Sequence, residues 1–479
     1  MTDKKGITVK KEEDFSEWYT QLVEQAELAD VRYGVKGFVV YREWSQHSME
    51  KMFRIMSDTL DRKGHMPVGF PAVIPEKNFL LEKEHVEGFQ PEVFWLEGKD
   101  EKLALRPTSE TAFHQMYSLW IRSHRDLPFK RYQRANIFRN EKTKSTRPFL
   151  RGREFHWIET HCAFASEKDA RKQVEEDMET TQEILYERFG IPHIFFERPQ
   201  WDKFPGAECT FAADALMGSG KVLQLPSTHL LGENFSKPFN IKYQAEDGSE
   251  KYCHLTCYGP AISRIYGGMI SLHSDNKGLR VPFELAPLQI AIIPVKHESN
   301  KDIVEKAKEI ESKLRKNYSV KVDERLDVTP GYKFNEYELK GVPIRIEIGP
   351  KDLEKESVMI ARRDTREKES VSINNLEKYV EKSAESYTFN LIKQAEQSFE
   401  ESIENCETKE EIKKALKMNK IARINLSSIG KDIEKDALAL EEEIGAEIRG
   451  SKLEEEKPFG KCILTGKEAA KVAYIAKSY

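Results

Sequence analysis

Two strand-like stretches that flank a cationic loop constrain the fold of this chain more than any other feature. Polar and apolar residues alternate in "ANIFRNE" (135–141) and "REFHWIE" (153–159), and in a strand such alternation puts every second side chain on one face. The connection "KTKSTRPFLR" is long for a hairpin, so the pattern predicts an antiparallel platform with a mobile basic loop at one end. The side chains expected to share a face are Ile137, Arg139 and Glu141 on the first strand, and Arg153, Phe155, Trp157 and Glu159 on the second.

The arginines of this platform offer planar, permanently charged forks that suit phosphate oxygens. One interpretation is therefore a binding site for a polyphosphate. The other is a solvated strand pair in which the arginines bridge to Glu141, Glu154 and Glu159. Spacing alone leaves both interpretations open.

Length and composition limit the number of domains and the class of protein to which this chain can belong. The chain has 479 residues, enough for roughly two to four domains, and its formal net charge of −5 means that a nucleic-acid partner requires a local basic patch. No apolar run approaches the roughly 18 residues of a membrane helix, and the polar N-terminus has neither a secretory nor a transit pattern. Six widely spaced cysteines fit reduced thiols. We expect a cytoplasmic protein that makes no membrane contact.

Two amphipathic helices follow from the 3.6-residue period. The first covers about residues 47–64 and ends at Gly64. The second starts at Ser166, with Asp169 three residues later as in a capping box, and ends at Gly190. Between them, "KLALRPTSETAF" (102–113) predicts a strand that turns into a helix at Thr108 or Ser109. The predicted inward residues are Met49, Met52, Phe53, Met56 and Leu60 in the first helix, and Val174, Met178, Leu185 and Phe189 in the second.

The pattern of apolar and charged residues changes near residues 285 and 386, which divides the chain into three parts. The predicted fold class is α/β (α+β). An apolar strand near 285–295, a Lys/Glu-rich helix near 300–316 and the strand "GVPIRIEIGP" predict a small α/β domain with a mainly parallel sheet. We expect a large domain at 1–284, this α/β domain at 285–385, and a small charged α+β domain at 386–479 that begins with a helix.

Three motifs in order resemble those of class II aminoacyl-tRNA synthetases. "GFPAVIP" resembles motif 1 with its proline at Pro71, "FRNE" with the basic loop and "RGREFHWIE" resembles motif 2, and "CYGPAISRIYGGMI" resembles motif 3 with Arg264. Finer matches to the archaeal and eukaryotic prolyl-tRNA synthetase family are "RPTSET", "WDKFPGAE", "QLPSTHLLGENFSK", "KGVPIRIEIGPKDLE" and the terminal "YIAKSY". The resemblance implies an antiparallel-sheet catalytic domain, an anticodon-binding domain, a small C-terminal domain, and a homodimer formed through motif 1.

The resemblance implies a two-step reaction: the carboxylate of L-proline attacks the α-phosphate of ATP, and the 3′-end of proline tRNA then accepts the prolyl group. The first step is an in-line phosphoryl transfer that needs positioning and charge neutralisation, with Mg²⁺ assisting, and no protein nucleophile. The catalytic residues implied are Arg139, at the α-phosphate and substrate carboxylate, and Arg264, at the adenine and the γ-phosphate. Further implied ATP ligands are Glu141, Arg147, Arg151, Gln224 and Ser227; for Gln224 and Ser227 the alternative is ordinary polar strand positions.

Proline recognition requires acceptors for a secondary ammonium and an apolar wall for the ring. The resemblance implies Thr108 and Glu110 as the acceptors, beside Arg139. Trp157, Phe204 and His229 would close around the ring; the alternatives are a core tryptophan and a buried, satisfied histidine. In the anticodon-binding domain, the resemblance implies Arg345 and Lys351 as tRNA contacts, because their side chains can donate hydrogen bonds to guanine acceptors. The alternative is that both are ordinary solvated cations.

Departures from the family concern zinc and proofreading. Many relatives bind zinc through four C-terminal cysteines, but here Cys406 and Cys462 stand with Glu411 and Thr465, a poor tetrahedral set, so we expect no tightly bound zinc. Cys253 and Cys257 are expected to be buried thiols. About 97 residues separate His161 from Tyr258, too few for the editing domain of bacterial relatives, so we expect misactivation of cysteine or alanine.

Two other functions compete with proline ligation. Another class IIa ligase is disfavoured because a metal-binding set suited to threonine is not evident, and "WDKFPGAE" with "PTSE" points to proline. A catalytically idle or substrate-altered paralogue that acts in RNA binding is compatible with divergent positions such as Cys209 and Ala213. Retention of Arg139, Glu141 and Arg264 together argues against it, since a binding module needs none of them.

Overall fold

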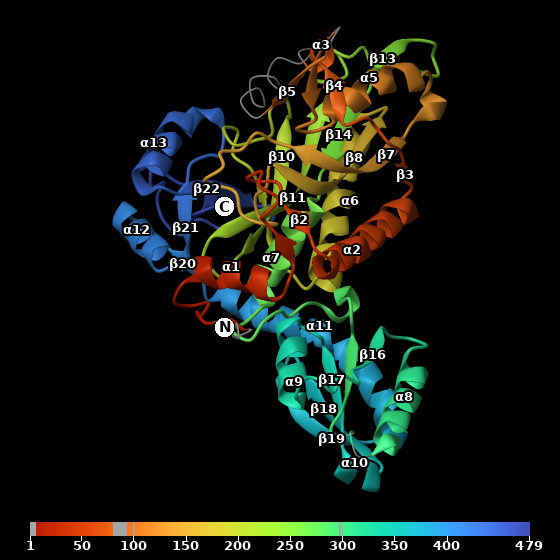
Figure 1. The fold of residues 1–479 in the computed structure, drawn as a ribbon. Coiled ribbons are helices and arrows are strands. Elements are labelled where there is room, and N and C mark those ends of the chain that lie inside the picture. Colours follow the sequence, from red (N-terminus) through yellow and green to blue (C-terminus); the bar gives the residue numbers. More distant parts are fainter. Residues whose placement is uncertain (1–5, 80–92, 99–100, 297, 299) are drawn as a thin grey trace.

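The computed structural model describes residues 6–79, 93–98, 101–296, 298 and 300–479. The N-terminal half forms a large lobe, the residues coloured cyan form a small lobe beneath it, and the blue C-terminal residues return to one side of the large lobe (Figure 1). Within those ranges no helix combines the length and the apolar character that crossing a membrane requires.

An eleven-stranded sheet, β20-β21-β23-β22-β9-β10-β11-β14-β8-β7-β3, organises the large lobe and continues into the C-terminal residues. The run from β9 to β7 is antiparallel throughout, as the class II resemblance implies, whereas the short edge strand β3 pairs parallel with β7. The strands of the large lobe are β3 (Met66–Pro67), β7 (Phe129–Phe138), β8 (Glu154–Phe164), β9 (Ile194–Glu197), β10 (Cys209–Leu216), β11 (Val222–Gly232) and β14 (His254–Tyr258).

The predicted antiparallel platform is confirmed as β7 and β8, which pair from Phe129↔Ala163 to Phe138↔Glu154. The prediction of one continuous face reaching Glu141 is wrong. Strand β7 ends at Phe138; the Arg139 amide still donates to the Arg153 carbonyl, but the Glu141 amide donates to the Arg139 carbonyl inside the loop. Because the backbone turns there, the strand alternation no longer sets where Glu141 points.

Helices α6 (Glu167–Thr181) and α7 (Ile262–His273) cover one face of this sheet. Ile158, Cys162 and Leu230 belong to the apolar cores beneath them. The intervening side chains of β8 therefore face the other side of the sheet, which is where the site described below lies.

Both predicted helices are confirmed. The first is α2 (Glu43–Arg62), whose predicted inward residues all belong to the main apolar core, and Gly64 after it has φ +82. The second starts as predicted, because the Ser166 side chain accepts the Asp169 amide at the N-terminus of α6. It differs at its end: the α-helix stops at Thr181 and a π-helical turn, η3 (Gln182–Arg188), carries the chain to Gly190.

Smaller elements complete the large lobe. The predicted strand-to-helix turn is confirmed as β6 (Lys102–Leu105) followed by α5 (Glu110–Trp120). The others are α1 (Phe15–Gln25), β1 (Ala29–Asp30), β2 (Val40–Tyr41), β4 (Val73–Pro75), α3 (Glu76–Phe79), β5 (Phe94–Glu97), η2 (His124–Asp126), β12 (Lys242–Gln244), β13 (Glu250–Tyr252) and η4 (Phe283–Leu285).

The small lobe has a five-stranded sheet, β16-β15-β17-β18-β19. Strand β15 pairs parallel with β16 and β17, as the β-α-β pattern predicts, but β17-β18 and β18-β19 are antiparallel, so the sheet is mixed rather than mainly parallel. Crossover helices α8 and α9 precede β17, but the connections after β17 are too short for a further crossover, which a parallel neighbour would need. The elements are β15 (Ile290–Pro294), α8 (Lys301–Leu314), β16 (Val320–Val322), α9 (Pro330–Leu339), β17 (Ile344–Ile348), α10 (Pro350–Glu354), β18 (Ser357–Arg362), β19 (Lys368–Ser372) and η6 (Ile373–Asn375).

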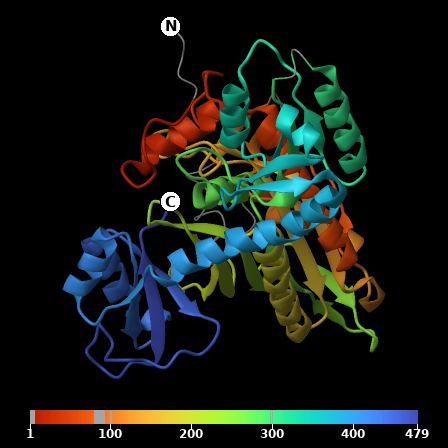
Figure 2. The ribbon, with the colours of Figure 1, turned by 90° about the horizontal axis from the view of Figure 1, so that it is seen from below.

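Helix α11 (Leu376–Glu400) links the small lobe to the C-terminal residues and runs without a break through residue 385 (Figure 2). The C-terminal strands then join the main sheet, because β22 pairs with β9 through Ser451↔Glu197 and Lys452↔Phe196. The elements are β20 (Ile403–Asn405), α12 (Lys409–Lys417), β21 (Ile421–Leu426), η7 (Lys431–Ile433), α13 (Glu434–Ile444), β22 (Glu447–Lys452) and β23 (Lys471–Ala476).

Candidate active site

A cavity of about 430 Å³ lies on the sheet face opposite α6 and beside the first turn of α7, which contributes Arg264. Cross-strand neighbours form its floor: Thr210 pairs with His229, His229 with Cys257, and Cys257 with His161, across β10, β11, β14 and β8. Residues at paired positions share a face of a sheet, so four strands contribute side chains to one surface.

An irregularity at Pro226 brings Gln224 and Ser227 to the same cavity. Strict alternation would put these two residues on opposite faces of β11. The register shifts here, because Ser227 pairs with Ala212 while Gln224 pairs with Asp214, which leaves one extra residue in β11. Proline lacks the amide that a regular ladder needs, so a bulge is a position where it is tolerated.

The cavity brings together most of the residues that the family resemblance assigns to ATP and proline. They come from the turn into α5, from the sheet strands, from the loop after β9 and from α7. Those that line it are Thr108, Glu110, Arg139, Trp157, Phe204, Gln224, Ser227, His229 and Arg264. Three predicted ATP ligands, Glu141, Arg147 and Arg151, are not among its lining residues.

The guanidinium groups of Arg139 and Arg264 line the cavity. Arg139 follows β7, its Nε donates to the Pro107 carbonyl at 3.2 Å, and its guanidinium lies 5.8 Å from the Trp157 ring centre. Arg264 comes from α7, and burial, with the nearby charges of Arg139 and Arg151, lowers its pKa to about 10. Like charges held this close disfavour one another, so an anion placed between them is stabilised.

The second half of the loop between β7 and β8 packs against α7. Phe149 and Leu150 are buried, and a Cβ added to Gly267 of α7 would lie 2.7 Å from the Phe149 Cβ. This close approach explains a glycine at that position of α7. Within the loop, Arg151 Nη2 lies 2.8 Å from Glu141 Oε2, and Arg147 hydrogen-bonds Ser16.

Thr108 and Glu110 lie at the turn into α5, and both are buried. The Thr108 hydroxyl donates to the Glu110 carboxylate. Burial raises the pKa of the neighbouring Cys257 thiol well above its usual value, and a hydrogen bond with Glu110 raises it further. The Cys257 thiol is therefore neutral beside the Glu110 carboxylate.

Aromatic rings form the opposite wall. Phe204 and His229 lie with ring centres 4.6 Å apart, and His229 contacts the Thr210 and Ser227 hydroxyls at 2.9 and 3.0 Å. Burial lowers the pKa of His229 to about 3, so its imidazole is neutral. The buried Trp157 Nε1 has no hydrogen-bond partner in the described ranges, which leaves a donor available to a ligand.

Sequence reasoning missed other lining residues. The alternation put Glu159 on the face of Trp157 without assigning it to the site, and two more residues along β8 it would have added His161; their side chains contact each other at 3.3 Å. Arg198 also lines the cavity, but its partners Asp214 and Arg449 lie 16 and 251 residues away in sequence, so no local pattern indicates it.

Metal-ligating side chains meet at one place in the part of the chain that the structure describes. Ligand atoms of Glu110, His161 and Cys257 lie within 4.8 Å of one another in the cavity. Cys406 and Cys462 are buried free thiols in the C-terminal core. The residues beside them in sequence serve other roles: the Glu411 carboxylate accepts the Glu407 and Thr408 amides before α12, and the Thr465 hydroxyl accepts the Lys467 amide.

The two predicted tRNA contacts occupy different surroundings in the small lobe. Arg345 of β17 donates to Glu347 at 2.9 Å and stacks on Phe334, with 4.4 Å from its guanidinium to the ring centre. It lines a hollow of about 190 Å³, as do Arg362, Arg363, Arg366 and Lys368. Lys351 is an exposed residue of α10 and is not among the lining residues of that hollow.

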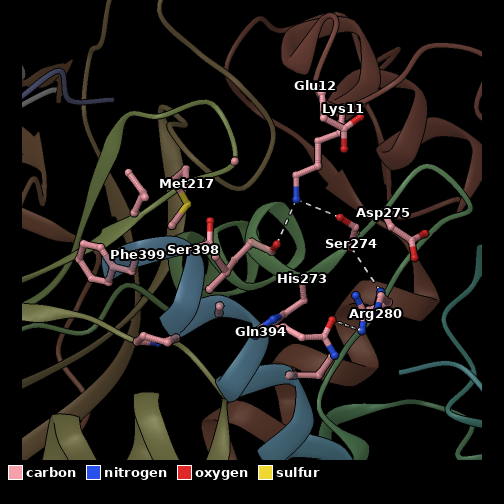
Figure 3. Close-up of a pocket in the computed structure, with 16 residues that line it drawn as sticks. Lys11, Glu12, Met217, His273, Ser274, Asp275, Arg280, Gln394, Ser398 and Phe399 are labelled. Carbon is pink, nitrogen blue, oxygen red and sulfur yellow. Dashed lines mark hydrogen bonds between the residues drawn. The ribbon is translucent and has the colours of Figure 1, made fainter. Parts of the chain in front are cut away.

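A second cavity, of about 320 Å³, lies where the N-terminal segment, the end of α7 and α11 meet (Figure 3). The Lys11 ammonium donates to the carbonyls of Leu272 and Ser274 at 3.0 and 2.9 Å, and burial lowers its pKa to about 8. On the other side, Asp275 pairs with Arg363 of the small lobe at 2.6 Å. These contacts fix the end of the helix that carries Arg264.

Three family models match successive parts of the chain. They are the tRNA synthetase class II core domain (G, H, P, S and T) at residues 94–273, an anticodon binding domain at 289–383 and the prolyl-tRNA synthetase C-terminal domain at 409–479. Curated proline--tRNA ligases are similar over nearly the full length. The ligase from Thermofilum pendens is 46% identical, with 99% of each chain covered, and that from Thermococcus kodakarensis is 42% identical, with 98% of each covered.

Solved structures agree with these matches. A Giardia lamblia prolyl-tRNA synthetase in complex with prolyl-adenylate superposes with a TM-score of 0.95 at 33% identity, covering 99% of this chain and 100% of that one. A Cryptosporidium parvum prolyl-tRNA synthetase complexed with L-proline and AMP gives 0.92 at 31% identity, with 99% of each chain covered. The sequence, the fold and the cavity thus agree, and the chain belongs to the prolyl-tRNA synthetase family of class II aminoacyl-tRNA synthetases.

Proposed function

We propose that this chain attaches L-proline to proline tRNA at the expense of ATP, through prolyl-adenylate. The observation that carries the proposal is a single cavity lined both by the guanidinium groups of Arg139 and Arg264 and by the Glu110 carboxylate. A triphosphate and an amino acid with a positive ammonium match these opposite charges. The relatives named proline--tRNA ligase and the solved complexes with prolyl-adenylate, proline and AMP support it.

Activation needs no nucleophile from the protein, because the proline carboxylate itself attacks the α-phosphate. In this proposal Arg139 holds the carboxylate and the α-phosphate together and Arg264 holds the far end of the nucleotide, so the reacting atoms are close and the developing charge is neutralised. Gln224 and Ser227 add contacts on the nucleotide side. Glu141 would accept the adenine amino group, and Arg151 and Arg147 would contact the outer phosphates from the loop.

Proline itself would lie between Glu110 and the aromatic wall. The secondary ammonium donates to Thr108 and Glu110, and the ring packs against Trp157, Phe204 and His229. Because His229 is neutral and is held by the Thr210 and Ser227 hydroxyls, it adds a polarisable wall without a charge that would repel the ammonium. A larger side chain would collide with this wall.

In this proposal Mg²⁺ binds in the cavity together with the nucleotide. Ser227 offers a neutral oxygen to the cavity, and Mg²⁺ in such sites is bound mainly by substrate phosphates and water. When bound, it would neutralise phosphate charge. Arg139 and Arg264 do the same from the protein side.

The transfer step brings in tRNA. Its terminal hydroxyl attacks the adenylate in the cavity while the anticodon is held by the small lobe. Arg345 and Lys351 are proposed as contacts there, the former beside a hollow rich in guanidinium groups. We further propose a cytoplasmic homodimer formed through the motif 1 segment around Pro71, the division at 1–284, 285–385 and 386–479, and a C-terminal domain without tightly bound zinc.

Proline-dependent ATP–pyrophosphate exchange tests the proposed function. The wild type should exchange with proline, and Arg139→Ala should lose several kcal/mol of transition-state stabilisation. Lys168→Ala is the matched control, because it removes a cation from the exposed surface of α6 on the opposite side of the sheet. A wild type without proline-dependent exchange would overturn the proposal and favour the idle paralogue.

A further inference from the structure

A buried cluster of two arginines and one aspartate joins the candidate active site to the C-terminal residues. Asp214 of β10 is fully buried, and Arg198 and Arg449 are 1% and 4% exposed. Arg198 Nη2 lies 2.6 Å from Asp214 Oδ1, and Arg449 Nε lies 2.7 Å from Asp214 Oδ2. Each guanidinium also reaches the other carboxylate oxygen, Arg198 Nη1 at 3.3 Å and Arg449 Nη2 at 3.2 Å, so both arginines hold the same carboxylate.

Arg449 belongs to β22, the C-terminal strand that pairs with β9 and extends the main sheet. It acts on Arg198 in two ways. Its side chain shares Asp214 with Arg198, and its backbone carbonyl accepts a 2.8 Å hydrogen bond from Arg198 Nη1. The C-terminal residues therefore hold Nη1 of Arg198 directly and the rest of its guanidinium through Asp214.

The same Nη2 that binds Asp214 also reaches Gln224. Arg198 Nη2 donates to Gln224 Oε1 at 2.9 Å, and both residues line the cavity. A guanidinium has donors and no acceptor, so it determines which end of the amide faces it. With Oε1 held by Arg198, the two N–H donors of Gln224 remain for a ligand in the cavity.

We propose that Arg198 is a positioning residue that orients the Gln224 amide toward the nucleotide, and that Arg449 of the C-terminal region sets the position of Arg198. The inference rests on the proposed function in taking Gln224 as a nucleotide contact. It assigns the C-terminal region a part in ATP affinity, through a relay from Arg449 and Asp214 to Arg198 and Gln224.

Calorimetric titration of the full-length protein with ATP tests the relay, and it needs no catalysis. Arg449→Lys keeps the charge but loses the two-pronged contact, and Arg198→Lys loses the donor to Gln224; each should weaken ATP binding about tenfold. Proline affinity, titrated separately, should not change. Arg423→Lys is the matched control, since Arg423 also forms an ion pair in the C-terminal region, with Glu456, but lies outside the cluster.

Gln224→Met separates the relay from general damage. If Arg449 acts through Gln224, Arg449→Lys should cost no further ATP affinity in the Gln224→Met background. Unchanged ATP affinity in folded Arg198→Lys and Arg449→Lys, an equal loss for proline, or additive losses in the double variant would each overturn the inference. If Arg449→Lys does not fold, Arg198→Lys can be combined with Gln224→Met in a double-mutant cycle that makes the same test. If the wild-type protein binds ATP but shows no proline-dependent ATP–pyrophosphate exchange, that result would contradict the proposed function and leave the relay inference standing.

Discussion

Arg151 and Glu141 are bound to each other, with Arg151 Nη2 2.8 Å from Glu141 Oε2. The proposed function gives these two residues different parts of the same nucleotide, the outer phosphates and the adenine. The ion pair ties together the two ends of the loop between β7 and β8, and both charges act on the guanidinium of Arg264, which lines the cavity.

ATP affinity should depend on Arg151 more than on its neighbour in the loop, Arg147. Arg151→Ala removes a guanidinium close enough to Arg264 to lower its pKa, and it should raise the KM for ATP about tenfold, the worth of one charged hydrogen bond. Arg147→Ala should have a smaller effect, because that side chain bonds Ser16. Lys144→Ala, an exposed cation of the same loop, is the control, and an equal rise in that variant would argue against a specific contact.

Proline affinity should depend on the charge of Glu110. Glu110→Gln keeps the size of the side chain and a hydrogen bond to Thr108 but removes the partner of the ammonium. The KM for proline should rise about tenfold or more, while the KM for ATP changes little. Exchange kinetics with each substrate varied in turn measure both constants on one preparation. A rise confined to ATP would contradict the proposed orientation of the substrates.

Cysteine and alanine should support measurable ATP–pyrophosphate exchange. Residues 161–258 are occupied by α6, η3 and the strands from β9 to β14, with no inserted domain. Discrimination must therefore come from the cavity, where a missing methylene is worth only about 1–3 kcal/mol. Exchange at background level with both amino acids would contradict this prediction. It would show that the cavity rejects small side chains by more than the free energy of the lost apolar contact.

Asp177 of α6 should make stability depend on pH. Burial raises its pKa to about 7, opposed by hydrogen bonds from Thr228 and Gln173. A carboxyl whose pKa is higher in the folded state binds its proton more tightly there, so its contribution to stability is complete below about pH 4 and is lost as the pH rises through 7. Asp177→Asn should therefore melt higher than the wild type at pH 8, and the advantage should shrink toward pH 5.

The control for this titration is Glu175→Gln, an exposed carboxylate on the same helix. Its melting temperature should follow that of the wild type across the pH range. If Asp177→Asn lowers the melting temperature equally at pH 5 and pH 8, the carboxylate is ionised throughout and its two hydrogen bonds outweigh the cost of burial.

Local pattern in the sequence determined much of this molecule. The apolar face of α2, the Ser166 cap of α6, the pairing of β7 with β8 and the turn into α5 at Thr108 all follow from spacing, because neighbours along the chain decide them. Family motifs then identified Arg139, Trp157 and Arg264 as residues of one site, which the cavity brings together.

Tertiary structure decided what depends on partners distant in the chain. The bulge at Pro226 turns Gln224 and Ser227 to one face, and only the register with β10 reveals it. Arg151 faces Glu141 because the loop is anchored on α7 through Phe149. Arg198 is held by Arg449, 251 residues later. A side chain's direction follows from its own segment, whereas its partner follows from how segments pack, and that packing is a property of the whole chain.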